Sequence, residues 1–120
     1  MKMTKDELKA ALRNFTGSEN WYRQPLFKNF TNTDGVQFLA ETAEAHWLID
    51  LILSSQYIAA VKAEPFQCWT LSVKDNAAVA TCDDGNGTVV YTQAIEFTDF
   101  PMEEIKLWLV DSVLMLPSEY

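Results

Sequence analysis

The stretch FQCWTLSVKDNAAVATC, residues 66–82, contains the pattern that decides the fold. Trp69, Leu71 and Val73 alternate with smaller polar residues, which is the period-two spacing of a strand with one buried face. An Asp-Asn pair beginning at Asp75 separates this run from a second run of small apolar residues, and such pairs favour tight reversals. The stretch therefore predicts an antiparallel β-hairpin.

A two-residue turn at this pair also predicts the register of the hairpin. Trp69 then lies opposite Cys82, and Cys68 lies opposite Asp83. Because side chains alternate between the two faces of a sheet, the sulfurs point to opposite faces, and we expect two reduced, structural thiols. A change of one residue in the turn would bring the sulfurs together, so this prediction depends on the turn.

Three more strands are expected further along the chain: TVVYTQAIEF (88–97), IKLWLV (105–110) and VLMLP (113–117). The last two could instead form a helix. We favour a hairpin, because Asp111 and Ser112 suit a tight reversal and the flanking Ile, Leu, Trp and Val suit strands. The expected fold class is α+β, with about five antiparallel strands in meander order.

The segment TDGVQFLAETAEAHWLIDLILSSQ, residues 33–56, predicts one long central helix. Its apolar residues keep a helical period, and residues 47–53 are apolar on nearly every side, which is typical of a buried helix. We expect this helix to cover one face of the meander. A capping box from Thr4 to Glu7 predicts a short amphipathic N-terminal helix. The aromatic connector that follows allows a short strand near residues 26–30, or it could equally form a binding lip.

Length and hydropathy predict a single domain over residues 1–120. No apolar run approaches the roughly 20 residues of a membrane span, so no membrane partner is expected. The first residues, MKMTKDELKAALRNF, are too charged for a signal peptide, and we therefore expect a cytoplasmic location.

Charge is the most unusual bulk property, because nine basic and seventeen acidic residues give a net charge of −8. Residues 1–28 hold six Lys or Arg and three Asp or Glu, a local charge of +3, whereas residues 29–120 hold three and fourteen, a local charge of −11. A body this acidic is expected to repel nucleic acid and to favour a protein partner with a basic surface. Ordinary solubility is the alternative explanation.

His46 and Asp50 are the two candidates for acid–base chemistry, since they lie four residues apart and would share one side of a helix. A catalytic pair also needs a reachable substrate and usually a nucleophile, whereas the residues around these two are large and apolar. We interpret them as a buried polar pair in which the imidazole satisfies the carboxylate. We expect no catalytic residues and no enzyme activity.

The loop CDDGNG, residues 82–87, partly resembles a calcium loop. Asp83, Asp84 and Asn86 provide only a fragment of the ligand set, the bidentate Glu is missing, and the two glycines suit a hairpin reversal. The sequence contains no phosphate-binding glycine loop, GxSxG, CxxC or HExxH pattern, and one histidine with two separated cysteines makes a poor zinc site. We therefore expect neither a cofactor nor a metal.

The segments FTGSENWYR, TDGVQFLAE, HWLID, CDDGNG, EFTDFP and LMLPSEY resemble the domain-of-unknown-function family 6876, over about residues 15–120. The closing LPSEY together with TDFP is the most specific part of the resemblance. The resemblance implies short bacterial, phage or plasmid proteins, a mobile-element setting in which small acidic proteins frequently block host enzymes or defence complexes. It supplies no catalytic or binding residues. His46 departs from it, because an aromatic such as Tyr is expected there.

These observations together favour a non-enzymatic protein-binding module, plausibly an inhibitor of a host nuclease or of a defence complex in the manner of an anti-CRISPR protein. The expected contacts are acids of turns and edges and three aromatic anchors: Asp75, Asp83, Asp84, Asp99, Glu103, Glu104, Trp21, Tyr22 and Tyr91. One alternative is a small enzyme or ligand-binding domain with a pocket between sheet and helix that uses His46 and Asp50. Another is a self-associating structural protein, a homodimer formed through an edge strand such as the terminal one.

Overall fold

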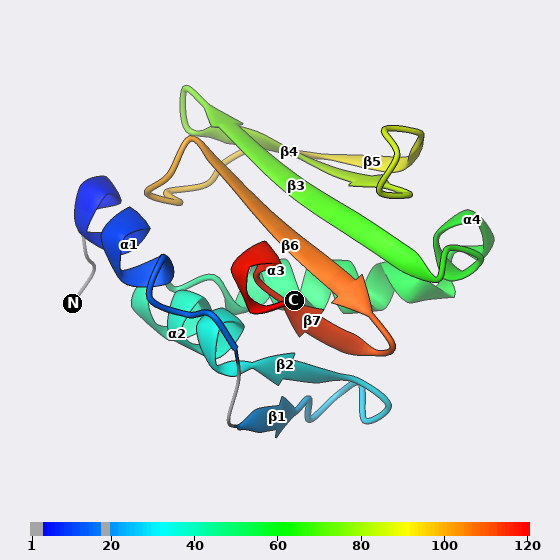
Figure 1. Ribbon diagram of the computed structural model, residues 1–120. Coiled ribbons are helices and arrows are strands. Elements are labelled where there is room, and N and C mark those ends of the chain that lie inside the picture. The colour runs from blue at the N-terminus through cyan, green and yellow to red at the C-terminus, as the bar shows by residue number, and fades with distance from the viewer. Residues whose placement is uncertain (1–3, 18–19) are drawn as a thin grey trace.

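The computed structural model describes residues 4–17 and 20–120 of the chain. Within these residues, seven strands form one mixed sheet in the spatial order β1-β2-β7-β6-β3-β4-β5 (Figure 1). The strands are β1 (Trp21–Arg23), β2 (Thr31–Thr33), β3 (Phe66–Lys74), β4 (Ala77–Asp83), β5 (Val89–Ile95), β6 (Glu104–Val110) and β7 (Val113–Met115). Neighbouring strands are antiparallel except β2 and β7, which are parallel.

Short helices accompany the sheet, and α2 and α3 lie against one of its faces (Figure 1). The helices are α1 (Lys5–Leu12), α2 (Asp34–Thr42), α3 (His46–Ser54) and α4 (Ala59–Lys62), with 3-10 turns η1 (Ser55–Tyr57) and η2 (Pro117–Glu119). The predicted capping box of α1 is confirmed, since Thr4 Oγ1 accepts from the Glu7 amide and Glu7 Oε1 accepts from the Thr4 amide. No helix among the described residues is long and apolar enough to cross a membrane.

The β3–β4 hairpin has the register that the sequence predicts, with Trp69 opposite Cys82. Asp75 and Asn76 both adopt positive φ, 53° and 62°, as the favoured two-residue hairpin turn requires. The cysteines are free and buried, as expected. Burial raises the pKa of the Cys82 thiol to about 12 and also raises that of Cys68, so both thiols are poor nucleophiles.

The β6–β7 hairpin is likewise present, and it turns at Asp111 and Ser112 with φ of 50° and 65°. The expected five-stranded antiparallel meander, however, is wrong, because β1 and β2 also join the sheet and the β2–β7 pair is parallel. The order of the strands differs as well. After β5 the chain returns across the sheet, so β6 pairs with β3 rather than with β5. The burial pattern explains this arrangement: Gln67, Cys68 and Trp69 in β3 are buried in succession, as in a central strand, whereas β5 alternates partly buried and exposed residues, as an edge strand does.

The single long central helix is also wrong, because the chain breaks into α2 and α3 at Glu44. Glu44 has φ of 53°, and the amide of Ala45 donates to the carbonyl of Ala40 at 2.9 Å. These are the features of a Schellman motif, in which a left-handed residue ends a helix. Glycine usually occupies that position, so a glutamate there gave the sequence pattern no visible stop signal.

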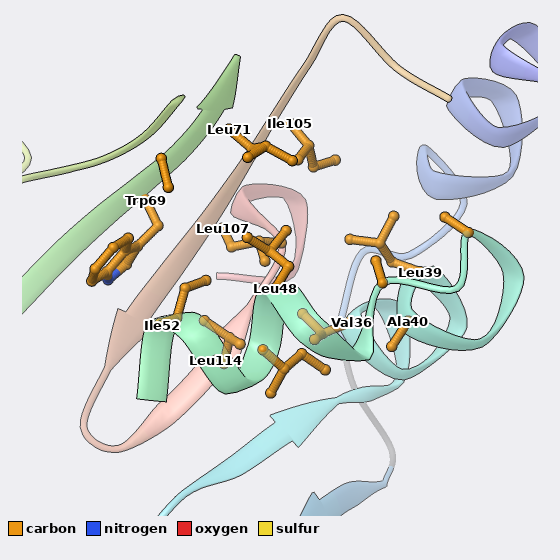
Figure 2. Packing of buried hydrophobic residues seen from close by; sticks show 14 of the residues in the cluster. Val36, Leu39, Ala40, Leu48, Ile52, Trp69, Leu71, Ile105, Leu107 and Leu114 are labelled. Atoms are coloured by element: carbon orange, nitrogen blue, oxygen red, sulfur yellow. The ribbon is translucent and has the colours of Figure 1, made fainter. Parts of the chain in front are cut away.

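The core lies between the helices and the sheet. Figure 2 shows side chains of α2 and α3 converging on those of β3, β6 and β7. Leu48 and Ile52 of α3 meet Trp69, Leu71 and Leu107 of the sheet, and the space between them is too small for a water molecule. Burial of such side chains supplies about 1.5–3 kcal/mol each, so this layer holds α3 in place.

Two distant segments meet where α2 begins. Glu119 accepts hydrogen bonds from the Thr33 hydroxyl at 2.6 Å, the Gly35 amide at 3.0 Å and the Leu116 amide at 3.0 Å. A Cβ on Gly35 would lie 2.5 Å from Glu119 Oε1, so a side chain there does not fit unless its neighbours move. The TDG and LPSEY segments are therefore one structural junction.

Candidate functional site

A groove of about 720 Å³ opens at one end of the sheet, and three stretches far apart in the sequence build it. They are the β1–β2 loop, the segment from the end of α3 to the start of β3, and the β6–β7 turn. All three stretches lie on the same side of the molecule in Figure 1. The groove is lined by Leu26, Phe27, Lys28, Asn29, Phe30, Leu53, Gln56, Tyr57, Lys62, Glu64, Pro65, Gln67, Leu109, Asp111 and Ser112.

The β1–β2 loop forms one wall of the groove, and hydrogen bonds to its backbone carbonyls fix its shape. Phe30 donates to the carbonyl of Phe27 at 2.9 Å, and the Arg23 guanidinium donates to the carbonyl of Lys28 at 2.8 Å. Residues 26–30 are thus a turn that two strands flank, and the expected short strand there is wrong. The Thr31 amide then donates to the Ser112 carbonyl, which ties this wall to the β6–β7 turn.

The opposite wall is held by the buried side chain of Gln67, at the start of β3. Its Nε2 donates to Gln56 Oε1 at 2.8 Å and to the carbonyls of Val61 at 2.9 Å and Glu64 at 3.2 Å. Its Oε1 accepts from Gln56 Nε2 and from the indole N–H of Trp69. This amide connects η1, α4 and β3, so it sets the position of the wall.

Apolar side chains at the mouth of the groove remain in solvent. Leu26 on one wall is 78% exposed, and Tyr57 on the other is 84% exposed. Lys28 and Lys62 contribute positive charge beside the acidic Glu64 and Asp111. Exposed apolar side chains next to charges of both signs are a combination found at protein interfaces.

The predicted acidic contacts do not form one surface. Asp75, Asp99, Glu103 and Glu104, here called the acidic end, lie at the end of the sheet away from the groove. Backbone hydrogen bonds from Thr98 to Asn76 and from Val73 to Glu103 hold these segments together. An ion pair of 2.8 Å joins Glu103 to Lys5 of α1, lowering the pKa of the carboxyl and raising that of the amine.

Asp83 ends β4 and Asp84 begins the β4–β5 loop, near the start of β3, and their carboxylates shape that loop. Asp83 accepts from the Gly85 amide at 2.7 Å, and Asp84 accepts from the amides of Asn86 and Thr88. The loop passes close over the ring of Phe66, which a Cβ on Gly85 would contact at 2.8 Å. These acids therefore have a structural role in the turn.

The three predicted aromatic anchors lie on opposite edges of the sheet. Trp21 and Tyr22 are on β1, with Trp21 66% exposed, and Tyr91 is on β5. The Tyr22 hydroxyl donates to Asp34, which raises the pKa of this tyrosine. Tyr91 is half-buried, donates to Gln93 and packs edge-on against Trp69. The anchors on β1 and the anchor on β5 are too far apart in the strand order to act as one patch.

His46 and Asp50 are exposed, so the expected buried pair is wrong. The buried residues of α3 include Leu48 and Ile52, and the two polar residues lie on the opposite side of the helix. With Ser54 they form a polar stripe at intervals of four residues, so α3 is not apolar on nearly every side as its sequence predicted. Neither lines the groove.

The sequence leaves open a binding lip in the aromatic connector, but it does not predict the groove. The connector places large apolar side chains such as Leu26 and Phe27 in a loop, where they are costly to expose unless something covers them. Lys28 and Lys62 gave no signal, because only the folded chain brings their segments together.

A family model matches the chain over most of its length. The model of the family described as "Family of unknown function (DUF6876)" matches residues 6–120. The chain belongs to this family. The match confirms the resemblance noted in the sequence, and the TDG–LPSEY junction described above lies inside the DUF6876 region. No curated protein and no solved structure matches the chain.

Proposed function

We propose that this DUF6876 protein is a non-enzymatic binding module that accommodates, in the groove, an apolar side chain from a loop of a protein with a basic surface. The observation that carries the proposal is the pair of exposed side chains, Leu26 and Tyr57, on facing walls of the groove. Exposed aromatic and aliphatic side chains around a concave surface are typical anchors of binding energy.

The charge of the chain supports a basic partner. A net charge of −8 attracts a positively charged protein over long distances and accelerates its association. The acidic end contributes to this steering without contacting the groove. A nuclease or a defence complex that handles nucleic acid, in the cytoplasm, is the class of partner that such a surface suits.

The test measures the Kd of one captured partner for variants at positions of similar solvent exposure. Tyr57→Ser and Leu26→Ser remove the anchors, whereas Phe97→Ser removes a ring that is 72% exposed but lies outside the groove. We expect each groove variant to raise the Kd about tenfold or more, and Phe97→Ser to change it less than about twofold. Equal losses for all three variants would contradict the groove as the binding site.

Salt dependence tests the electrostatic part separately. Neutralising Asp75 and Glu104 at the acidic end should lower the association rate with little change in the dissociation rate. Binding should also weaken from low to high ionic strength. An affinity that is independent of salt would eliminate the basic partner while leaving the groove variants informative.

A further inference from the structure

The strand order leaves one long strand exposed at the edge of the sheet. β5 ends the order, so along one side its backbone faces no other strand of the described residues. The terminal strand β7, by contrast, pairs on both sides with β2 and β6, so it cannot be the edge through which a dimer forms. β5 is seven residues long, whereas the other edge, β1, has three.

Two of the usual features that protect an edge strand, charge and proline, are absent from β5, although α4 packs against this strand. Its sequence, VVYTQAI, contains no charged residue and no proline, although the whole chain carries a charge of −8. The only irregularity in its pairing with β4 falls near Val90, at its beginning, and Tyr91–Ile95 pair regularly. Long, uncharged edges of this kind pair with other strands.

We propose that β5 pairs with β5 of a second copy of this chain, antiparallel and with a two-fold axis at Thr92. This interface lies outside the groove, so it goes beyond the proposed function.

The pairs that such an axis creates are chemically matched. Tyr91 of one copy lies opposite Gln93 of the other, and these two groups already hydrogen-bond within each strand at 2.9 Å. On the other face of the sheet, Thr92 of one copy lies opposite Thr92 of the other, and Val90 of one copy lies opposite Ala94 of the other. Cross-strand pairs that match polar with polar and apolar with apolar stabilise a sheet, and no like charges oppose each other. A strand from an unrelated protein would have no reason to match this pattern.

Sedimentation equilibrium over a wide concentration range tests the proposal. The chain of 13.7 kDa should approach twice this mass as concentration rises, and the dimer should tighten with salt because both copies are acidic. Thr92→Lys places two ammonium groups at the axis and should weaken the dimer about tenfold or more. Ser72→Lys, which adds the same charge at an exposed position on the interior strand β3, should leave the dimer unchanged.

Disulfide trapping tests the register without disturbing the fold. Cysteines at position 92 should cross-link readily, because opposed residues have Cα atoms about 4.5–5.5 Å apart. Ala94→Cys should not cross-link, since the two positions are offset by four residues, about 13 Å along the strands. The native thiols of Cys68 and Cys82 are buried and should not cross-link. A chain that stays monomeric at every concentration, or one that traps both variants equally, would overturn the proposal.

Discussion

The groove and the acidic end occupy opposite ends of the sheet and are built differently. The acidic end consists of the β3–β4 turn and the segment leading into β6, which backbone hydrogen bonds hold together, and its charges are exposed. The groove joins the β1–β2 loop, the α3–β3 segment and the β6–β7 turn, and its lining includes the buried Gln67 and the core residues Leu53 and Leu109. The charge of the acidic end is visible in the sequence, whereas the shape of the groove depends on contacts between segments far apart in the chain.

Removing the side-chain amide of Gln67 should have the largest effect on stability and binding, because this amide holds the groove and not the acidic end. Gln67→Leu keeps the volume but leaves the Trp69 indole N–H and the Val61 carbonyl without their partner. We expect a loss of about 2 kcal/mol or more in the free energy of unfolding, measured by urea denaturation. Weaker partner binding should accompany it, because the wall of the groove is no longer fixed.

Ser72→Ala, at an exposed position of the same strand, is the control and should stay within about 0.5 kcal/mol of the native chain. Equal stability of the two variants would show that the amide network does not hold the groove.

The break between α2 and α3 allows a second test of what positions the groove, because Leu53 of α3 is one of its lining residues. Glu44→Gly should stabilise the chain by about 1 kcal/mol, because glycine adopts positive φ without the cost that glutamate incurs. Glu41→Gly, at an exposed position inside α2, should destabilise it by about 1 kcal/mol. Thermal unfolding of both variants measures the difference. Destabilisation by both would mean that one continuous helix spans the break.

The smallest effect concerns pH at the acidic end. The Lys5 ion pair lowers the pKa of Glu103, so its contribution to stability is present above the ordinary Glu pKa of about 4.3 and disappears as the pH falls through the lowered value. Glu103→Gln should therefore be slightly less stable than the native chain at neutral pH and indistinguishable from it in strong acid. Urea titrations at the two pH values test this. A difference that persists in strong acid would contradict the ion pair as its source.

Local sequence predicted the parts of the fold that depend on local chemistry. The alternation around Trp69 and the turn at Asp75 fixed a register, and the reversal at Asp111 fixed a second hairpin. The order of the strands could not be predicted in this way, because β6 reaches β3 across the sheet and the junction at Glu119 joins residues far apart in the chain. The exposed polar stripe of α3 could have been predicted from the sequence, because His46 and Asp50 lie four residues apart and therefore on one side of a helix.

The most direct test of the groove as the binding surface is the amide NMR footprint of the captured partner on the isotope-labelled chain. The largest shift changes and line broadening are expected at residues 26–30, 53–57, 62–67 and 109–112. Changes concentrated at the acidic end, or along the stripe that begins at His46, with the groove unaffected, would contradict the account.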